Sequence, residues 1–329
     1  MKKKALVAGA GGFIGHHMVA FLKTKGYWVR GVDKKKPEFE PTKADEFLLL
    51  DLREKENALK ATKGMDYVFN LAANMGGIGY IESIHAEIMR DNLLINIHLL
   101  ESSRINKIKR FFFSSSACVY PTYRQQKVVN MGLKESDAYP ADPGNEYGWE
   151  KLVNERICMN YYLDHKLETR IARFHNIYGP RGAWQGGKEK SPAALCRKIA
   201  LAKDGRTIEV WGDGKQGRSY CYIDDCVVGV HKLMMSNIRE PLNIGSDRLV
   251  SINELIDIIS TAAEKTVKKK YDVSKPQGVR GRNSDNTRLK KLLHWEPSIS
   301  LEAGLKETYD WIQTQIKKGK LLPEKKSLY

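Results

Sequence analysis

The feature that most constrains the fold is a regular alternation of short apolar runs and longer amphipathic stretches over the first 115 residues. The apolar runs have the length and composition of buried strands, and the stretches between them are long enough for helices. Strands are predicted at residues 4–8, 28–32, 47–50, 66–71 and 110–114, and helices at residues 14–25, 54–60 and 84–104. Strands separated by helices form right-handed βαβ crossovers, so the sequence predicts an α/β fold with a doubly wound parallel sheet.

A glycine-rich string, GAGGFIG, joins the first predicted strand to the first predicted helix. Gly9 permits a tight turn, Gly12 lets the backbone approach a pyrophosphate, and Gly15 allows the helix to pack closely on the strand. The start of the helix, at Phe13 and Ile14, offers N–H groups and a partial positive charge to phosphates. The string therefore predicts a Rossmann-type dinucleotide-binding site.

The type of dinucleotide depends on Asp33, which closes the second predicted strand. An acid at this position suits the two ribose hydroxyls of NAD. The lysines at 34–36 could accept the 2′-phosphate of NADP, but the carboxylate would repel that phosphate, so we expect NAD. Ligands bind at the carboxyl ends of strands in such sheets. The residues after the third and fourth strands therefore join the predicted cofactor site: Asp51, Leu52, Leu71, Ala72 and Ala73.

A YxxxK pair, Tyr147 and Lys151, lies in a segment with helical periodicity at residues 146–161. The i, i+4 spacing places both side chains on one helix face. A free tyrosine has a pKa of about 10, and a neighbouring ammonium stabilises its phenolate. The pair is therefore a candidate general base for an alcohol. Ser116, at the end of the fifth predicted strand, could bind the same substrate oxygen.

The composition bears on partners and compartment. Lys plus Arg number 55 against 39 Asp plus Glu, a net charge of +16, which suits either nucleic acid or an anionic substrate. The lysine runs are scattered and lack interleaved aromatic residues, so we expect no nucleic-acid partner. No run approaches the roughly 18 apolar residues of a membrane span. Five cysteines without a CxxC pair or a zinc-like cluster favour a cytoplasmic protein with no metal.

The pattern of the sequence changes after about residue 175, because Gly-rich loops there separate shorter predicted elements. We therefore expect two domains. The NAD-binding domain comprises residues 1–175 with a returning segment at about 219–245. A smaller, mixed α/β substrate domain comprises residues 176–218 and 246–329.

The glycine string, the serine-rich strand end and the YxxxK pair together resemble the extended short-chain dehydrogenase/reductase superfamily. Further strings resemble its GDP-mannose 3,5-epimerase family more closely: LAANMGG, SSACVYP, GKEKSP and GVRGRNSDN. The likeness runs from near residue 4 to about residue 315. The chain differs from the familiar pattern at Asn74, where an acid is usual.

The resemblance implies an NAD-dependent isomerase with an acid/base pair at Cys118 and Lys190. Oxidation at C4 of the sugar, with Tyr147 taking the hydroxyl proton, would acidify the C–H bonds at C3 and C5. The pair would then invert those centres before C4 is reduced again, converting GDP-D-mannose to GDP-L-galactose, with GDP-L-gulose as the C5-only product. Thiol and lysine pKa values can both be brought near neutrality.

The resemblance also implies the residues that contact the GDP-sugar: Gly76, Gly77, Ser116, Asn176, Glu189, Lys190, Lys198, Gln216, Arg218, Arg280 and Arg282. It further implies a homodimer, paired through the helices near residues 84–104 and 147–162. The alternative interpretation is a C4-epimerase or dehydratase acting on another nucleotide sugar. A C4-epimerase needs no Cys118–Lys190 pair, and a dehydratase needs an acid poised for water loss.

Overall fold

A parallel β-sheet forms the centre of the computed structural model, which describes residues 2–129 and 131–322. Its strands are β1 (Lys4–Ala8), β2 (Trp28–Asp33), β3 (Glu46–Leu49), β4 (Tyr67–Asn70), β5 (Arg110–Ser116), β6 (Thr169–Phe174) and β11 (Leu242–Ile244). Within the described residues these seven strands are ordered β11-β6-β5-β4-β1-β2-β3, and every pair is parallel. The predicted α/β doubly wound fold is confirmed.

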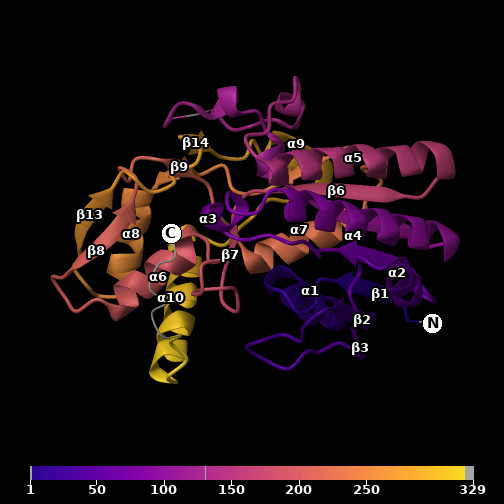
Figure 1. Cartoon of the computed structure of the whole chain (residues 1–329), viewed down its shortest axis with the longest axis horizontal. Helices are drawn as coiled ribbons and strands as arrows, with labels where there is room; N and C mark the ends of the chain where they lie inside the picture. The colour runs from indigo at the N-terminus through magenta and orange to yellow at the C-terminus, as the bar shows by residue number, and fades with distance from the viewer. Residues whose placement is uncertain (1, 130, 323–329) are drawn as a thin grey trace.

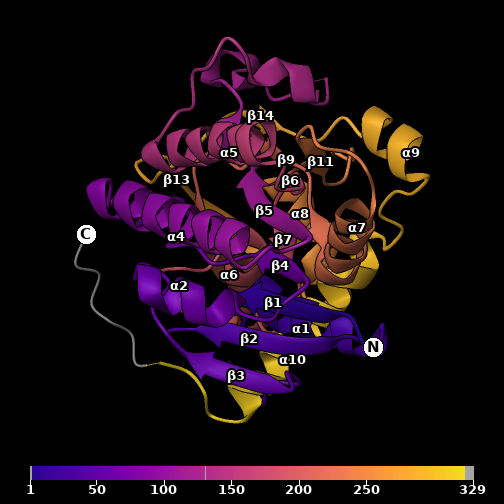
Figure 2. The same cartoon turned by 90° about the vertical axis from the view of Figure 1, so that its right-hand side faces the viewer.

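Both faces of the sheet are buried because apolar side chains alternate along the strands. On β1, Ala5 and Val7 join one core cluster, and Leu6 and Ala8 join another. Helices α1 (Phe13–Thr24) and α7 (Ile223–Met235) cover the first face. Helices α2 (Lys55–Thr62), α4 (Ala86–Ile105) and α5 (Glu146–His165) cover the second, and Figure 2 shows the two layers on either side of the strands.

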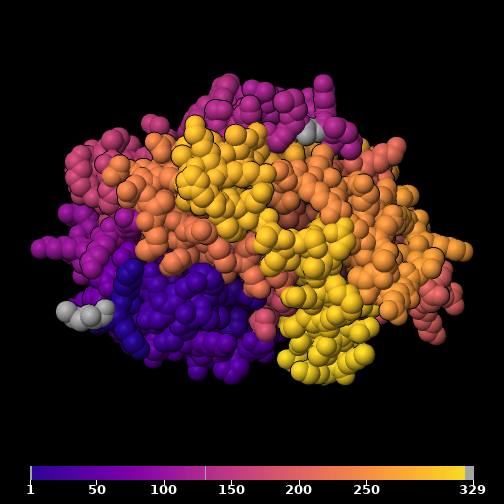
Figure 3. Space-filling view, turned by 180° about the vertical axis from the view of Figure 1, so that it is seen from behind, coloured from indigo at the N-terminus to yellow at the C-terminus, as the bar shows by residue number. Residues whose placement is uncertain are grey.

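The elements beyond the sheet form a second group, seen on the left of Figure 1. Its helices are α6 (Ser191–Leu201), α8 (Ile252–Ala262) and α10 (Leu301–Lys317), and α9 (Thr287–Leu293) packs beside β11. Its short strands are β7 (Ile177–Tyr178), β8 (Thr207–Trp211), β9 (Gly217–Arg218), β10 (Cys221–Tyr222), β12 (Val250–Ser251), β13 (Lys268–Asp272) and β14 (Gly281–Arg282). Seen from behind, yellow α10 lies between the indigo N-terminal part and the orange residues of α8 (Figure 3). The two-domain division stays a prediction.

Each strand and helix expected in the first 115 residues is present, with its ends within two residues of the predicted ones. The structure adds the single turn α3 (Ile78–Ile81) before α4, and three 3₁₀ turns, η1 (Ala117–Val119), η2 (Thr122–Gln125) and η3 (Glu135–Ala138). Elements this short carry no periodic signal, which is why the sequence does not predict them. In the described ranges, no helix is both long and apolar enough to cross a membrane.

The strand order places the end of β1 beside the end of β4. The chain leaves β1 toward β2 on one side and returns to β4 on the other, so a crevice opens between their carboxyl ends. The backbones approach closely here: Gly9 has a φ of +81°, and a Cβ on it would lie 2.7 Å from the carbonyl oxygen of Leu71. Only glycine fits this position.

Helix α5, which carries the YxxxK pair, is fixed to β6 by a buried ion pair. Arg173 Nη2 lies 2.7 Å from Glu155 Oε2, and both side chains are almost fully buried. Ser115 Oγ donates to the same carboxylate at 2.6 Å, and Arg173 also donates to the carbonyl oxygen of Glu135. The hydrogen bonds satisfy both charges, so the pair sets the position of the helix over the sheet.

Replacing Glu155 with Ala should lower the free energy of unfolding by about 3–5 kcal/mol, because it leaves the Arg173 cation buried and unpaired. Urea denaturation followed by circular dichroism measures this. Lys306→Ala, which breaks the exposed pair with Asp310 on α10, is the matched control and should unfold at nearly the wild-type midpoint. Equal midpoints for the two variants would contradict the assigned role.

Candidate active site

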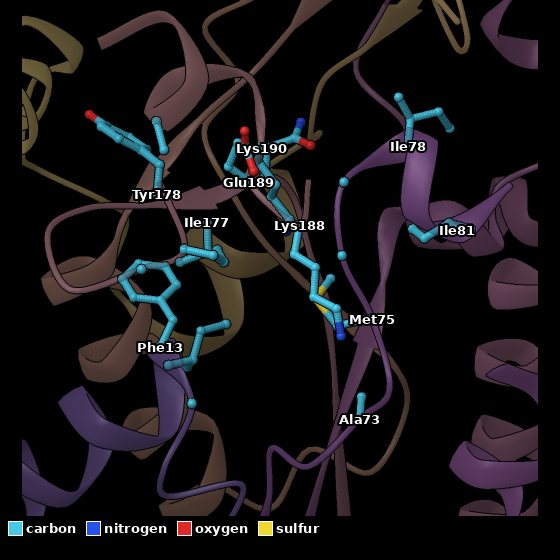
Figure 4. A pocket seen from close by; sticks show the side chains of 18 of the residues that line it. Phe13, Ala73, Met75, Ile78, Ile81, Ile177, Tyr178, Lys188, Glu189 and Lys190 are labelled. Atoms are coloured by element: carbon cyan, nitrogen blue, oxygen red, sulfur yellow. The ribbon is translucent and has the colours of Figure 1, made fainter. Parts of the chain in front are cut away.

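A cavity of about 1000 Å³ runs along the carboxyl ends of the strands and into the second group of elements. It brings together the predicted cofactor residues Gly9, Gly12, Phe13, Ile14, Gly15, Asp33, Asp51, Leu52, Leu71, Ala72, Ala73, Tyr147 and Lys151. It also brings together Gly76, Gly77, Ser116, Cys118, Asn176, Glu189, Lys190, Lys198, Gln216, Arg218 and Arg282. Arg280 is outside its lining. Figure 4 shows part of the cavity, with Phe13 and Ile177 on one side and Met75 on the other.

The glycine string forms a cradle at the start of α1. Gly12 is the N-cap residue of α1, the first turn of the helix holds no acidic side chain, and Gly12–Gly15 line the cavity, so the N–H groups at the start of the helix are available to an anion. A Cβ on Gly15 would lie 2.0 Å from the carbonyl oxygen of Gly9, and a Cβ on Gly11 would lie 2.1 Å from that of Lys35. The cradle can therefore hold a pyrophosphate against backbone N–H groups.

Asp33 closes β2 beside this cradle. Its carboxylate accepts N–H hydrogen bonds from Gly11 at 3.0 Å and from Lys35 at 3.2 Å. Burial raises the pKa of Asp33 despite these hydrogen bonds. The carboxylate is thus held at the rim of the cavity, where it fits the ribose hydroxyls of a dinucleotide. Lys34–Lys36 are exposed.

Asp51 already forms an ion pair with Arg53, a residue of the cavity lining that we did not predict from the sequence. Arg53 Nη2 lies 2.5 Å from Asp51 Oδ2, and its Nη1 lies 3.2 Å from Asp91 Oδ1 on α4. These hydrogen bonds lower the pKa of Asp51. The arginine therefore ties the loop after β3 to α4.

Tyr147 and Lys151 lie on one face of α5, as the spacing predicts. Lys151 Nζ is 5.4 Å from the centre of the Tyr147 ring, and both side chains are buried. Burial raises the pKa of the Tyr147 phenol, nearby Glu150 raises it further, and a hydrogen bond with Ser116 opposes these effects only in part. These surroundings favour the neutral phenol, and added positive charge in the cavity would favour its ionised form.

Cys118 is a thiol with unusual electrostatics. Arg282 Nη1 donates to its Sγ at 3.3 Å, and its backbone N–H donates to Ser116 Oγ at 3.1 Å. Burial favours the neutral thiol, but Arg282, a side-chain hydrogen bond with Ser116 and the more distant Lys190 outweigh it and lower the pKa of Cys118. These surroundings therefore favour the thiolate more than those of a free cysteine do.

The other four cysteines behave as ordinary packed side chains. Cys158, Cys196, Cys221 and Cys226 are buried, and burial raises the pKa of each. Among the described residues no cluster of three His, Cys, Asp or Glu side chains could hold a metal ion.

Lys190 is the N-cap residue of α6 and is half-buried, with its side chain lining the cavity. Burial lowers the pKa of this lysine, and the nearby sulfur of Cys118 opposes that effect only in part. A lowered pKa makes the neutral amine, the form that accepts a proton, easier to reach than in a free lysine. Its charge and that of Cys118 affect each other, so the two groups share one region of the cavity.

Two loops meet across the cavity mouth beside Lys190. Gly77 N donates to the carbonyl oxygen of Lys188 at 3.1 Å, and a Cβ on Gly77 would lie 2.5 Å from the carbonyl oxygen of Glu189. The resemblance implies that Gly77 contacts the GDP-sugar, and in the structure this glycine also lets one loop approach the other. Lys188 reaches toward Met75 in Figure 4, and its ammonium lies 4.0 Å from the centre of the Tyr80 ring.

At the end of the cavity that the second group of elements lines, Arg218 and Arg282 lie close enough for their charges to interact, while Lys198 of the lining is held by Glu209. Burial and the nearby Arg282 lower the pKa of Arg218 to about 10. Arg218 donates only to backbone carbonyl oxygens, those of Gly217 and Gln277, among the hydrogen bonds of the described residues. An anion bound here would relieve the repulsion between the cations, so this end suits a diphosphate.

The other residues that were predicted to contact the substrate form hydrogen bonds or ion pairs with residues of this chain. Arg280 forms an ion pair with Asp213 at 3.0 Å, which directs it away from the cavity. Asn176 donates to the carbonyl oxygen of Ser219, and Glu189 pairs with Arg197. Gln216 donates to Trp211, while its Oε1 is buried and, among the described residues, unpartnered. That oxygen can accept a hydrogen bond from a ligand.

Comparisons with known proteins agree on one family. The sequence profile of the NAD dependent epimerase/dehydratase family matches residues 5–245. GDP-mannose 3,5-epimerase of Arabidopsis thaliana is 50% identical over 99% of this chain and 86% of its own length. Solved UDP-glucose 4-epimerase of Thermotoga maritima is 26% identical, with a TM-score of 0.84, over 95% of this chain and 99% of that one. Solved UDP-glucuronic acid 4-epimerase of Bacillus cereus, in complex with UDP-glucuronic acid and NAD, is 26% identical, with a TM-score of 0.80, over 94% and 99%.

Replacing Arg282 with Met should raise the pKa of Cys118, because the cation that favours the thiolate is gone while burial remains. The pH dependence of Cys118 alkylation by iodoacetamide measures this, with Cys118→Ala as the blank. The pH midpoint should move upward in Arg282→Met. Arg280→Met removes an arginine that is bound to Asp213 instead, and its midpoint should match the wild type. Equal shifts in both variants would refute the contact-based explanation.

Proposed function

The chain belongs to the NAD dependent epimerase/dehydratase family and within it to the GDP-mannose 3,5-epimerases, and from this premise we propose its reaction. It inverts C3 and C5 of GDP-D-mannose to give GDP-L-galactose, with GDP-L-gulose as the C5-only product. The observation that carries the proposal is the pairing of Cys118 with Lys190 in one cavity. The pKa of the thiol and the pKa of the ammonium are both lowered, which favours proton exchange by each group.

The inversion needs a C–H bond that is acidic enough to lose its proton. NAD, when bound, supplies this by accepting a hydride from C4 of the sugar and later returning it. Tyr147 takes the proton of the C4 hydroxyl, Ser116 binds the same oxygen, and Lys151 supplies positive charge beneath the phenol. The C4 ketone then acidifies the C–H bonds at C3 and C5. Cys118 and Lys190, on opposite faces of the sugar, remove and return those protons.

NAD rather than NADP fits the residues of this chain. The Gly12 cradle and the start of α1 would hold the pyrophosphate. Asp33 would accept from the ribose hydroxyls and would repel a 2′-phosphate, although Lys34 and Lys35 also line the cavity. Asp51 and Leu52 and the residues 71–73 would complete the cofactor site.

The substrate diphosphate is assigned to the cations at the end of the cavity that the second group of elements lines, chiefly Arg218, Arg282 and Lys198. Gln216 Oε1, which is buried and has no hydrogen-bond partner in the part of the chain that the structure describes, would accept a hydrogen bond from the nucleotide. Arg280 would have to leave Asp213 to take part, so we rank it below Arg282. Asn176, Glu189, Gly76 and Gly77 would border the sugar.

The alternative of a C4-epimerase or dehydratase on another nucleotide sugar fits the site less well. A C4-epimerase has no use for the acid/base pair at Cys118 and Lys190. A dehydratase needs an acidic residue poised for water loss, and the position after β5 carries Cys118 instead.

We also propose that the protein is a cytoplasmic homodimer. Helices α4 and α5 lie side by side and carry exposed apolar side chains: Ile97, Trp149 and Val153. Pairing of these helices with those of a second copy would cover them. The basic net charge then reflects the diphosphate cations and exposed lysines rather than a nucleic-acid partner.

The purified protein incubated with GDP-mannose in D₂O should incorporate deuterium at C3 and C5, because both centres exchange protons with the acid/base pair. NMR of the recovered sugar measures this. Cys118→Ala should abolish the exchange without loss of bound NAD, since the thiol lies outside the cofactor cradle. Inversion at C4 with both protons retained would overturn the proposal, and full exchange in Cys118→Ala would overturn the role of the thiol.

Asp33→Ala should weaken NAD binding roughly ten- to a hundred-fold, because the charge-assisted hydrogen bonds between the carboxylate and the ribose are lost. Preference should also shift toward NADP, because the lysines at 34–36 are no longer opposed by the carboxylate. Titration of the apoprotein with each dinucleotide gives the two affinities. Asp137→Ala, which changes an acid outside the cavity lining, should leave both affinities as they are.

A further inference from the structure

A fully buried carboxylate, Glu150, lies beside the catalytic face of α5 and has no part in the steps above. Its Oε1 is 3.6 Å from Lys151 Nζ, and the two side chains are 0% and 2% exposed. Its two oxygens accept hydrogen bonds from Asn92 Nδ2 at 2.7 Å and Asn154 Nδ2 at 2.9 Å. Burial raises the pKa of Glu150, and the Lys151 ammonium and the hydrogen bonds from Asn92 and Asn154 oppose that effect and favour the carboxylate.

The same hydrogen bonds continue to the loop at the sugar end of the cavity. Asn92 lies on α4, and its side chain both accepts from Asn74 N at 2.6 Å and donates to Asn74 O at 3.1 Å. Asn74 Oδ1 accepts in turn from Tyr80 at 2.7 Å. The loop that carries Gly76 and Gly77 is therefore joined to Lys151 through Asn92 and Glu150.

We propose that Glu150 is a positioning residue that holds the Lys151 ammonium beneath Tyr147 and links it to the loop at residues 74–77. The carboxylate and the ammonium neutralise each other in a water-poor site, so the lysine keeps one place. The proposal rests on the proposed function, because Lys151 matters only if Tyr147 exchanges the proton of a substrate hydroxyl.

The charges around Tyr147 make this role measurable. Glu150 and Lys151 face it from α5, Ser116 from the end of β5 and Cys118 from η1. Asp91, next to Asn92 on α4, is paired with Arg53 and Arg90. Glu150 is a charge that raises the pKa of Tyr147, and removing it should lower that pKa.

The test compares Glu150→Gln, Glu150→Asp and Glu155→Gln in the holoenzyme. Glu150→Gln loses the charge and one acceptor, so kcat for GDP-mannose should fall roughly 100-fold, the cost of about 1 Å of misplacement. Glu150→Asp keeps the charge and should recover part of that loss. Glu155→Gln changes an equally buried acid of α5 that pairs with Arg173 instead. The glutamine has the size of glutamate and keeps an oxygen that can accept from Arg173 or Ser115, so α5 should stay in place while stability falls, and the variant controls for lost stability.

Carbon-13 NMR of proteins labelled at tyrosine Cζ gives a readout independent of activity, with Tyr147→Phe assigning the signal. The Tyr147 signal should titrate at lower pH in Glu150→Gln than in the wild type, Glu150→Asp or Glu155→Gln. Unchanged titration together with wild-type kcat in folded Glu150→Gln would overturn the proposal. If the wild type leaves GDP-mannose unchanged, the proposed function fails, and the titration still decides whether Glu150 acts on Tyr147.

Discussion

The close approach of backbone at the ends of β1 and β4 sets where the rest of the site lies. Gly9 and Gly15 have no room for a Cβ, so the turn after β1, the start of α1 and the strand end at Leu71 meet without side chains between them. That contact opens the crevice between the two halves of the sheet. Helix α5 then brings Tyr147 and Lys151 to the same crevice, held there by the buried pair of Glu155 and Arg173.

Residues of the same type differ in their electrostatic surroundings, and so in their pKa values and in the roles they suit. Five cysteines are present, yet only Cys118 has a cation at its sulfur and a lowered pKa among those the structure describes. Lys190 has a pKa lowered by burial, whereas most lysines of this basic chain are exposed. The net charge therefore says little about the chemistry. Whether a cysteine or lysine is suited to proton transfer depends on its position beside the cavity.

Much of the site could be predicted because its residues share an element or a strand end. The glycine string, Asp33 and the pair Tyr147–Lys151 follow from spacing along one strand or one helix, and all line the cavity. The roles of Cys118 and Lys190 came from resemblance, since 72 positions separate them and spacing cannot show that they meet.

Periodicity along the sequence could not predict the contacts between elements that lie far apart in the chain. Arg53 reaching Asp91, Gly77 against Glu189, and Arg280 bound to Asp213 each join segments that no local pattern connects. Glu150 looked like any polar residue of an amphipathic helix. Its complete burial depends on the facing asparagine of α4, which only the fold brings opposite it.

The hydrogen bond from Arg282 to Cys118 also bears on how the protein meets oxidants. The thiolate is the form that peroxides attack, so the cation that lowers the pKa of Cys118 also favours oxidation of this sulfur over the four cysteines whose pKa values are raised. The other four are buried as neutral thiols and are protected. Oxidation to a sulfenic acid would occupy the cavity and remove one member of the proposed acid/base pair, so the proposed catalytic role and the sensitivity to oxidants depend on a single contact.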